Sequence, residues 1–393
     1  MKPEYSLNLV HRSDLKPYLS PEHFEFRDTV NRALSKHANA DYIRECDEHK
    51  RFPEELMKLA AEQGWFALTL PEQYGGVGSY LDMTAFLEIA GYYSIALSRF
   101  WNHNVNMVGG ALARFASEEI KSDILPRLAQ GKCYLSFALS ENGSGSDAAS
   151  LTTRGEPDGD DYVINGTKMW ITGAAVADYI LTAVRTDKSA KKHDGISLFL
   201  VPTTSTGLQI NPIDLLGGSA IRTCEVVYEA VRVPKRLLVG ELHYGWRRLT
   251  TVLSKERVAL AAMCTGAAQA AVDLARWYAN ERKQFGQPII DFQMVSQMLV
   301  DMQTKVDASR LMAYRAARLL EEGENCDVES SQAKYLASDT YVQVATDGIQ
   351  IMGANGYSME YAMQRHYRES KMFQIFGGTN QIQRSIVGRS LRT

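Results

Sequence analysis

The sequence predicts an α+β protein of three domains: an N-terminal helical domain, a middle antiparallel β-barrel or sandwich, and a C-terminal four-helix bundle. The main observation is that the period of the apolar residues changes twice, from helical spacing to alternation and back. The length of 393 residues also suits two or three domains. The changes of period place the domain boundaries at residues 1–132, 133–244 and 245–393.

The first segment is typical of helices joined by a glycine-bearing loop. Residues 52–65 (FPEELMKLAAEQGW) carry apolar residues at helical spacing, with a proline near the start. Residues 81–97 (LDMTAFLEIAGYYSIAL) predict a second, apolar-rich helix. The loop between them is residues 70–76 (LPEQYGG).

The middle segment alternates with a period of two. Its short β-branched or aromatic runs are separated by turn residues, as in EPDGDD and TTSTG. This pattern predicts an antiparallel sandwich or barrel. The expected strands are residues 133–140, 161–166, 168–173, 179–186, 195–202, 208–213 and 224–234.

The last segment predicts long helices that form a bundle. The first would run from Trp246 to Gly286, with a proline beyond its end. The second would start at Asp291 with an apolar stripe, the third would span about 330–352, and the fourth would follow Tyr361. The stripe consists of Phe292, Val295, Leu299, Met302 and Val306.

The composition excludes several classes of function. The chain is 45% apolar and 23% charged with a net charge of −3, so nothing favours nucleic acid or an anionic membrane. No continuous apolar run approaches the ~20 residues of a membrane-spanning helix. Residues 1–16 show neither a secretory signal nor a transit peptide. The five widely spaced cysteines fit a reduced, cytoplasmic setting, and no His/Cys cluster suggests a metal.

The segment GSGSDA (residues 143–148) fits the dinucleotide pattern G-x-G-x-x-G/A. That interpretation requires a following helix and an α/β repeat. The next residues, SLTTRGEPDGDDYVING, predict a hairpin instead, so we reject a Rossmann fold here. The loop is either a plain turn or a place where the backbone approaches a phosphate closely.

Signatures along nearly the whole chain, from about Ser20 to Arg392, resemble the acyl-CoA dehydrogenase family. They are, in order, LPEQYGG, LSENGSGSD, INGTKMWITG, ERKQFGQPIIDFQ, QIMGANGY and GGTNQIQR. The second departs from the family's usual TEPGAGSD by Ser140 for threonine and Asn142 for proline. The helix–strand–helix order agrees with the acyl-CoA dehydrogenase fold.

The resemblance implies FAD and the dehydrogenation of an acyl-CoA thioester, in which the α carbon loses a proton and the β carbon a hydride to flavin N5. It also implies electron-transferring flavoprotein as acceptor and a homotetramer or dimer. The residues that should line the flavin ring are Phe137, Leu139, Ser140, Trp170 and Thr172. Those that should hold the rest of FAD, some across a subunit interface, are Arg282, Phe285, Gln293, Gln350, Gly353, Thr379 and Gln381. The substrate candidates are Ser146, Arg257, Gly378 and Arg389.

The position of the catalytic base also follows from the resemblance. Most family members have a glutamate before the GT of the last motif, where this chain has Gly377. The long-chain and isovaleryl-type members are similar to it in having glycine there, and their glutamate precedes an arginine on the first long C-terminal helix. In this chain LSKERVALA places Glu256 before Arg257 at that point, so the resemblance implies Glu256 as the base.

The residues are consistent with this assignment. A thioester α-proton is too weakly acidic for a carboxylate in water, so the charge that develops on the thioester oxygen must be stabilised. Gly377 and Gly378 precede a helix predicted from Thr379, whose free backbone N–H groups suit that task. Burial should raise the pKa of Glu256. The alternative, an exposed glutamate paired one turn away, is weakened because neither residue four positions away is a cation.

Arg99 lies where the resemblance places the far end of the acyl pocket. Burying its charge without a partner would cost several kcal/mol. It therefore reaches solvent, pairs with a carboxylate such as Glu88, or meets an anionic acyl tail. Glutaryl-CoA-type members carry an arginine in this neighbourhood, which an ungapped register places at Ser98.

Other functions on the same fold stay open at this point. They are an acyl-carrier-protein dehydrogenase, an enoyl-CoA-type reductase, a desulfinase, an oxidase, and a flavin-binding homologue without turnover. The intact Glu256 argues against the last of these. The sequence does not determine the length or branching of the acyl group.

Overall fold

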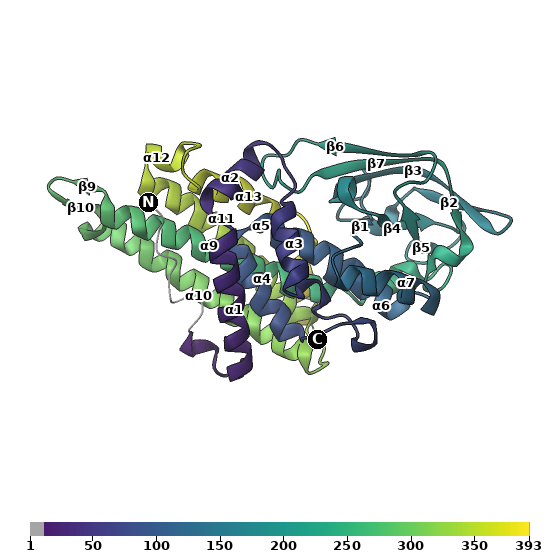
Figure 1. Cartoon of the computed structure of the whole chain (residues 1–393), viewed down its shortest axis with the longest axis horizontal. Coiled ribbons are helices and arrows are strands. Elements are labelled where there is room, and N and C mark those ends of the chain that lie inside the picture. Colours follow the sequence, from purple (N-terminus) through teal and green to yellow (C-terminus); the bar gives the residue numbers. More distant parts are fainter. Residues whose placement is uncertain (1–11, 393) are drawn as a thin grey trace.

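The computed structural model describes residues 12–392, so residues 1–11 of the N-terminal stretch assessed for a leader lie outside it. The predicted fold class is confirmed: helices, then a sheet, then helices again. The β domain lies at one end of the molecule and the C-terminal bundle at the other (Figure 1). The N-terminal helices are α1 (Pro21–His37), α2 (Ala40–Glu48), α3 (Glu54–Glu62), α4 (Tyr80–Tyr93), α5 (Ile95–Trp101), α6 (Gly110–Phe115) and α7 (Glu118–Ala129).

The single helix expected over residues 81–97 is two helices, α4 and α5. They are separated at Ser94, which has an extended ψ of 106° and whose hydroxyl caps the second helix by accepting from the backbone N–H of Leu97 at 3.2 Å. Serine favours such caps over helix interiors, which explains the break. Beyond α5 the chain continues into a π-helical segment, η5 (Asn102–Gly109), a conformation that is frequent at functional sites.

The middle domain is one eight-stranded sheet in the order β6-β7-β3-β2-β4-β5-β8, with β1 paired to β4. Most neighbouring strands are antiparallel, as expected, but the sheet is mixed, because β1 runs parallel to β4 and β2 meets β4 in parallel at one residue pair. The β2–β3 hairpin confirms that no Rossmann helix follows the glycine loop. The strands are β1 (Leu135–Ala138), β2 (Arg154–Asp158), β3 (Asp161–Thr172), β4 (Tyr179–Arg185), β5 (Ile196–Pro202), β6 (Leu208–Ile213), β7 (Thr223–Pro234) and β8 (Leu238–Val239).

The C-terminal bundle departs from the expected helices at both ends of the first one. The helix expected from Trp246 to Gly286 is interrupted where three β-branched residues, Thr250 to Val252, lower helix propensity. It also ends five residues early, before a hairpin whose turn contains Gly286 with a φ of 86°. The elements are α8 (Gly245–Thr250), α9 (Leu253–Glu281), β9 (Lys283–Gln284), β10 (Gln287–Pro288), α10 (Gln293–Glu321) and α11 (Asp327–Met352).

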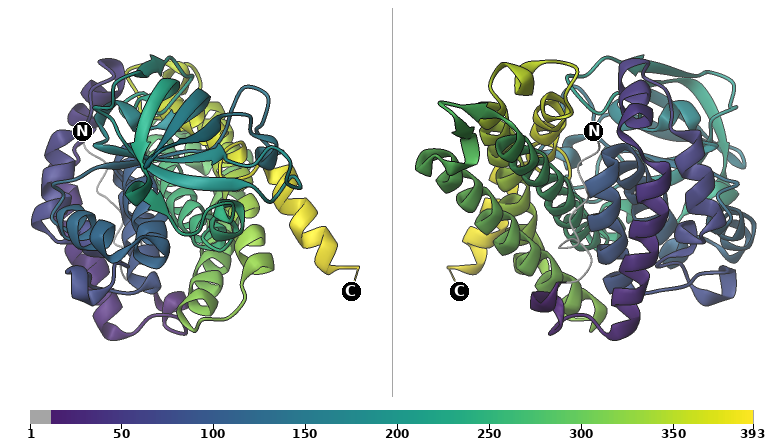
Figure 2. Two further views of the ribbon diagram at one scale, coloured as in Figure 1. Left: turned by 90° about the vertical axis from the view of Figure 1, so that its right-hand side faces the viewer. Right: turned by 60° about the vertical axis from the view of Figure 1, so that its left-hand side comes forward.

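The expected fourth long helix is divided as well. Short helices α12 (Ala354–Tyr357) and α13 (Met363–Ser370) lead through the turn η10 (Lys371–Gln374) to a glycine loop and α14 (Asn380–Ser390). α14 projects away from the body of the molecule (Figure 2). The two glycines of the loop, with left-handed φ values, are the physical reason for the break.

α9 is the central helix of the molecule and packs against α4, α10 and α11. The segment Gly245–Glu281 is long and apolar enough, by length and composition, to cross a membrane, with a mean hydropathy of 1.5 over its window. This was not expected, because polar residues such as Thr265 and Gln269 interrupt its apolar runs. Since 89% of the window is buried inside the protein, we interpret it as a core helix.

Candidate functional site

Glu256 lies in the first turn of α9, directly after the break at Val252. It is only 6% exposed. Burial raises the pKa of its carboxyl from 4.5 to about 7, while the charges of Lys334 and Arg257 act in the opposite direction. No side-chain hydrogen bond or ion pair joins it to any of residues 12–392. Such a carboxylate is available to take up a proton near neutral pH.

The loop formed by Gly377 and Gly378 faces Glu256. A Cβ atom added at Gly377 would lie 3.4 Å from Oε1 of Glu256, so the backbone approaches the carboxylate closely. The φ values of the two glycines are 63° and 76°, which residues with side chains rarely adopt. The backbone N–H groups of Gly377, Gly378 and Thr379 donate to no acceptor in the described part of the chain. They are free donors beside a carboxylate, the arrangement that stabilises a developing oxyanion.

The carbonyl groups of the same loop are held from the other side. Nε2 of Gln383 donates to the Gly377 and Gly378 carbonyls at 3.0 and 3.1 Å. Nζ of Lys334 donates to the Gly378 carbonyl at 2.9 Å. Because a trans peptide is planar with C=O and N–H on opposite sides, fixing a carbonyl also fixes the next N–H. The hydroxyl of Thr379 then caps α14 by accepting from the N–H of Ile382 at 3.2 Å.

The residues expected at a flavin ring meet where β1 and β3 lie side by side. The carbonyl of Ser140 accepts from the backbone N–H of Met169 at 2.9 Å, and the hydroxyl of Ser136 donates to the Thr172 carbonyl at 2.8 Å. These bonds bring the segment after β1 against the end of β3. The expected residues in this region are Phe137, Leu139, Ser140, Trp170 and Thr172.

Trp170 is 53% exposed and has a φ of 67°, an uncommon conformation for a residue with a side chain. Phe137 and Leu139 are only partly buried. An exposed indole beside partly covered apolar residues, in a backbone held by a local shift of strand register, fits a flat aromatic ring system that would cover them. The residues present here therefore fit the flavin of FAD.

The residues expected to hold the rest of FAD are spread over three other places. Arg282 and Phe285 lie on the β9–β10 hairpin, at the end of the molecule opposite the β domain, and Phe285 is 96% exposed (Figure 1). Gln350 and Gly353 lie at the C-terminal end of α11. A single copy does not bring the hairpin to the β1–β3 region. The others are Gln293 at the start of α10, and Thr379 and Gln381 at the start of α14.

The substrate candidates have mixed surroundings. Ser146 and Arg389 are exposed, the first in the loop before β2 and the second on α14. Arg257 is buried and its Nη1 pairs with Oδ1 of Asp327 at 3.0 Å. Gly378 is part of the donor loop. Whether these residues bind coenzyme A stays a prediction.

The surroundings of Arg99 differ from two of the three that were expected, namely solvent and an ion pair with Glu88. It is 3% exposed, so it does not reach solvent, and Glu88 pairs with other arginines. Its guanidinium donates to the backbone carbonyls of Gly218, at 3.0 Å, and Ile221. These carbonyls belong to the loop between β6 and β7, so Arg99 joins α5 to the β domain. Burial lowers its pKa to about 10.

His103, on η5, was not found by sequence reasoning. Its Nδ1 lies 3.0 Å from the Arg99 carbonyl, and its ring stacks on Phe376, which precedes the glycine loop. Burial lowers its pKa to about 4, so it is neutral at neutral pH. Lys334 and Gln383 were also missed, because a lysine and a glutamine within amphipathic helices give no distinctive signal.

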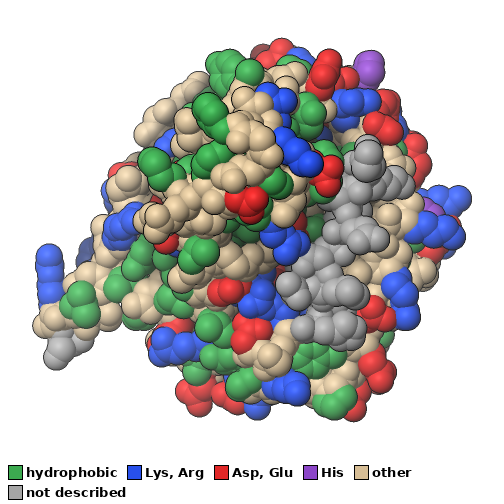
Figure 3. Space-filling model, turned by 90° about the vertical axis from the view of Figure 1, so that its left-hand side faces the viewer, with side chains coloured by type: hydrophobic (Ala, Val, Ile, Leu, Met, Phe, Trp, Pro, Cys, Tyr) green, Lys and Arg blue, Asp and Glu red, His purple; other side chains and the backbone are tan. Residues whose placement is uncertain are grey.

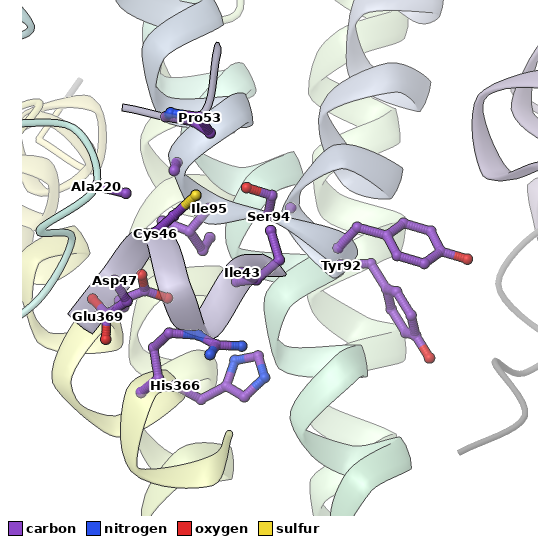
Figure 4. Close-up of a pocket in the computed structure, with 14 residues that line it drawn as sticks. Ile43, Cys46, Asp47, Pro53, Tyr92, Ser94, Ile95, Ala220, His366 and Glu369 are labelled. Carbon is purple, nitrogen blue, oxygen red and sulfur yellow. The ribbon is translucent and has the colours of Figure 1, made fainter. Parts of the chain in front are cut away.

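A second buried polar cluster lies between α2 and α13, around a cavity of about 40 Å³. Figure 4 shows the carboxylates of Asp47 and Glu369 close together, with His366 beside them. Burial raises the pKa of Glu369 to about 7, and the charge of Asp47 acts in the same direction. Among the described residues there is no group of three or more side chains that could hold a metal ion.

Comparison with known families matches the whole architecture. Residues 20–132 match the acyl-CoA dehydrogenase N-terminal domain, residues 136–231 the middle domain and residues 243–392 the C-terminal domain. A probable acyl-CoA dehydrogenase of Mycobacterium leprae is 38% identical over 377 residues, which cover 95% of this chain and 96% of that protein.

Two further relatives bear on the chemistry. The CarC subunit of the caffeyl-CoA reductase–Etf complex of Acetobacterium woodii is 34% identical over 380 residues, covering 95% of this chain and 99% of that one. The structure of butyryl-CoA dehydrogenase from Megasphaera elsdenii superimposes with a TM-score of 0.91 at 30% identity, covering 95% and 99% of the two chains.

Proposed function

Because the chain belongs to the acyl-CoA dehydrogenase family, an FAD-binding family of oxidoreductases, we propose that it oxidises an acyl-CoA thioester to the trans-2-enoyl thioester with Glu256 as the base. The observation that carries the proposal is the pairing of Glu256 with the glycine loop. A buried carboxylate without a hydrogen-bond donor among the described residues lies beside Gly377, and the backbone N–H groups of Gly377, Gly378 and Thr379 donate to none of the described residues. The carboxylate can accept a proton, and the backbone N–H groups can donate hydrogen bonds to an anion.

The cofactor is FAD. Trp170, Phe137, Leu139, Ser140 and Thr172 would hold its ring, and bound FAD supplies the acceptor for the β-hydride. The residues on the hairpin, on α11 and on α14 would hold its ribityl, diphosphate and adenosine parts, those on the hairpin in a second copy of the chain.

The reaction then depends on two groups of this chain. Glu256 removes the α-proton, and its pKa of about 7 leaves it largely ionised at slightly alkaline pH. As the proton leaves, negative charge develops on the thioester oxygen. The N–H groups of the Gly377–Thr379 loop would donate to that oxygen, so the charge is stabilised where it forms.

The experiment is anaerobic absorption spectroscopy of the purified, FAD-loaded protein against a panel of acyl-CoA thioesters. At least one thioester should bleach the flavin band. Glu256→Gln should keep FAD and still bind that thioester, but should lower the rate of bleaching by roughly 10³-fold or more, because the shape is retained while the base is lost. A near-normal rate in Glu256→Gln would show that another group takes the proton.

A reductase is the second candidate, favoured by the relative named as a subunit of a caffeyl-CoA reductase complex. The same geometry would serve in reverse, with protonated Glu256 as the proton donor. Chemically reduced protein, mixed with the enoyl-CoA that matches each acyl-CoA, distinguishes the two. Faster recolouring by an enoyl-CoA than bleaching by its acyl-CoA would favour the reductase.

We propose electron-transferring flavoprotein as the partner, since that relative is named as part of an Etf complex. Self-association into a homotetramer or dimer is supported by the large apolar side chains exposed on the C-terminal elements. Figure 3 shows hydrophobic side chains on this end of the molecule, with α14 projecting from it. The exposed residues include Phe285, Met294, Tyr357 and Leu391. A cytoplasmic location is supported by five free, buried cysteines.

A further inference from the structure

Lys334 is a buried cation that holds the glycine loop beside the proposed base. It lies on α11, is 1% exposed, and its Nζ donates to the Gly378 carbonyl at 2.9 Å and to Oδ1 of Asn380 at 3.0 Å. A lysine is almost never fully buried unless it is paired, and the hydrogen-bond partners of this one among the described residues, the Gly378 carbonyl and Asn380, are neutral. A salt bridge therefore does not explain why a charged lysine is buried at this position.

Asn380 makes the position of Lys334 rigid. Its Oδ1 also accepts from the hydroxyl of Ser338 at 3.1 Å, and its Nδ2 donates to Oδ1 of Asp339 at 2.7 Å. Both partners lie on α11, one turn from Lys334. The start of α14 is thus bound to α11, and Lys334 reaches the Gly378 carbonyl from a fixed frame.

The glycine loop brings Lys334 and Glu256 to the same region. Lys334 donates to the Gly378 carbonyl, and a Cβ at Gly377 would lie 3.4 Å from Oε1 of Glu256. Two cations oppose the effect of burial on this carboxyl: Lys334, which comes from the facing helix, and Arg257 on its own helix. Arg257 is already paired with Asp327, whereas Lys334 has only neutral hydrogen-bond partners. Burial in turn lowers the pKa of Lys334 to about 8, opposed by Cys264, Glu256 and Asp339.

We propose that Lys334 is a positioning residue with two tasks: it fixes the peptide that presents the oxyanion donors, and its charge favours the ionised form of the base. The first task acts through the Gly378 carbonyl and the second acts through space on Glu256. The proposal rests on the function proposed above, and adds to it the source of both the loop geometry and the electrostatics.

Gln383 provides the variant that separates the two tasks. Its Nε2 holds the same two carbonyls without any charge. Lys334→Met removes a hydrogen bond and a charge, and Gln383→Met removes hydrogen bonds alone. Lys255→Met is the control for a lost lysine, because Lys255 precedes Glu256 but lies over the ring of Tyr80.

The experiment has two readouts in the FAD-loaded protein. The first is infrared titration of the Glu256 carboxyl without substrate, with the band assigned by its loss in Glu256→Gln. The second is the pH profile of bleaching by a thioester from the panel. Lys334→Met should move the titration midpoint up by about one pH unit and lower the alkaline plateau of the rate by at least about 10-fold. Gln383→Met should lower the plateau and leave the midpoint unchanged, and Lys255→Met should change neither.

Three results would overturn the inference. An unchanged midpoint in Lys334→Met removes the electrostatic task, an unchanged plateau removes the positioning task, and an equal shift in Gln383→Met shows that loop position rather than charge sets the midpoint. If Lys334→Met does not fold, Lys334→Gln gives the same midpoint test. A normal rate in Glu256→Gln would end the proposed function, while the infrared midpoints would still test the charge of Lys334.

Discussion

Glu88 and Glu256 are buried carboxylates on two helices that pack together, α4 and α9, yet their surroundings are opposite. Glu88 accepts from Arg27 at 2.7 Å, Arg310 at 2.6 Å and Tyr314 at 2.8 Å. Although burial alone would raise its pKa, the two arginines lower it to about 2. Glu256 has no such donors, and its pKa is about 7.

The comparison teaches that the donors around a buried carboxylate, and not burial itself, decide its role. Glu88 is permanently ionised and joins the N-terminal domain to the bundle. Glu369 shows that a raised pKa is not sufficient either. Its pKa is also about 7, but the cavity it borders, about 40 Å³, has room for about one or two water molecules and not for an acyl group. Of these three glutamates, Glu256 is the one that combines a raised pKa with a nearby loop whose backbone N–H groups have no acceptor among the described residues.

The largest effect should come from breaking the Glu88 network. Glu88→Gln should lower the free energy of unfolding by about 3–5 kcal/mol, because it removes the buried carboxylate with which both Arg27 and Arg310 pair. Arg310 keeps a second ion pair, to Asp307 at 2.6 Å. Chemical denaturation measures this. Glu322→Gln, which removes an exposed ion pair with Arg318, is the control and should change stability by less than about 1 kcal/mol. Equal effects of the two variants would contradict a structural role for Glu88.

Glu256→Gln should raise the free energy of unfolding, whereas Glu88→Gln should lower it. Unfolded, Glu256 ionises with a pKa near 4.5, and folded with a pKa of about 7. Between these values the unfolded chain binds fewer protons, so wild-type stability falls as the pH rises, and the fall is complete above about pH 7. Glutamine cannot ionise. The variant should therefore gain about 3 kcal/mol relative to wild type between pH 4 and pH 8. A pH-independent difference would mean that the folded pKa is ordinary.

Gly377→Ala should disturb the loop and the base together. The added Cβ would lie 2.3 Å from Cδ1 of Leu260, and the φ of 63° is strained for alanine. We expect a loss of about 2–4 kcal/mol and slower bleaching. Gly286→Ala is the matched control, with a φ of 86° and nothing within 4 Å of its Cβ, so it should show only the backbone cost of about 1 kcal/mol. If the two variants lost similar amounts of stability, an added Cβ at Gly377 would not clash with Leu260.

The smallest effect should come from Arg99→Met. The variant loses hydrogen bonds to two carbonyls but also removes a buried charge, so stability should change by only about 1 kcal/mol. If Arg99 serves the β6–β7 loop, the ratio of KM values for a ω-carboxyl and a neutral acyl-CoA of equal length should not change. A ratio that rises at least about 10-fold would instead assign Arg99 to an anionic acyl tail.

The fold class was predictable from the sequence because the apolar period changes at the domain boundaries, whereas Glu256 as the base stays a prediction that the resemblance implies. The period of the apolar residues predicted the three domains, and the burial and raised pKa of Glu256 are consistent with its proposed role. The interruptions at Ser94 and at Val252 were not predictable, since the apolar pattern continues through them. Their cause is local: a serine that caps, and a run of β-branched residues.

The residues that hold the glycine loop, Lys334 and Gln383, could not be predicted from the sequence for a different reason. Lys334 and Gln383 are far apart in the chain and act through carbonyl groups, which carry no side-chain signal. Arg99 illustrates the limit from the other direction. Its charge was expected to reach solvent, a carboxylate or an anionic acyl tail, whereas backbone carbonyls of the β domain accept hydrogen bonds from part of its guanidinium. Contacts to backbone across domains do not follow from residue type.

The close approach of Gly377 to Glu256 and Leu260 has an evolutionary consequence. Positions 256, 260 and 377 share one small volume, because a Cβ at 377 would meet both other side chains. A glutamate at position 377 would therefore crowd Leu260 and Glu256 as they now lie. We predict that a smaller residue at position 260, as in Leu260→Ala, would ease the acquisition of a glutamate in the loop.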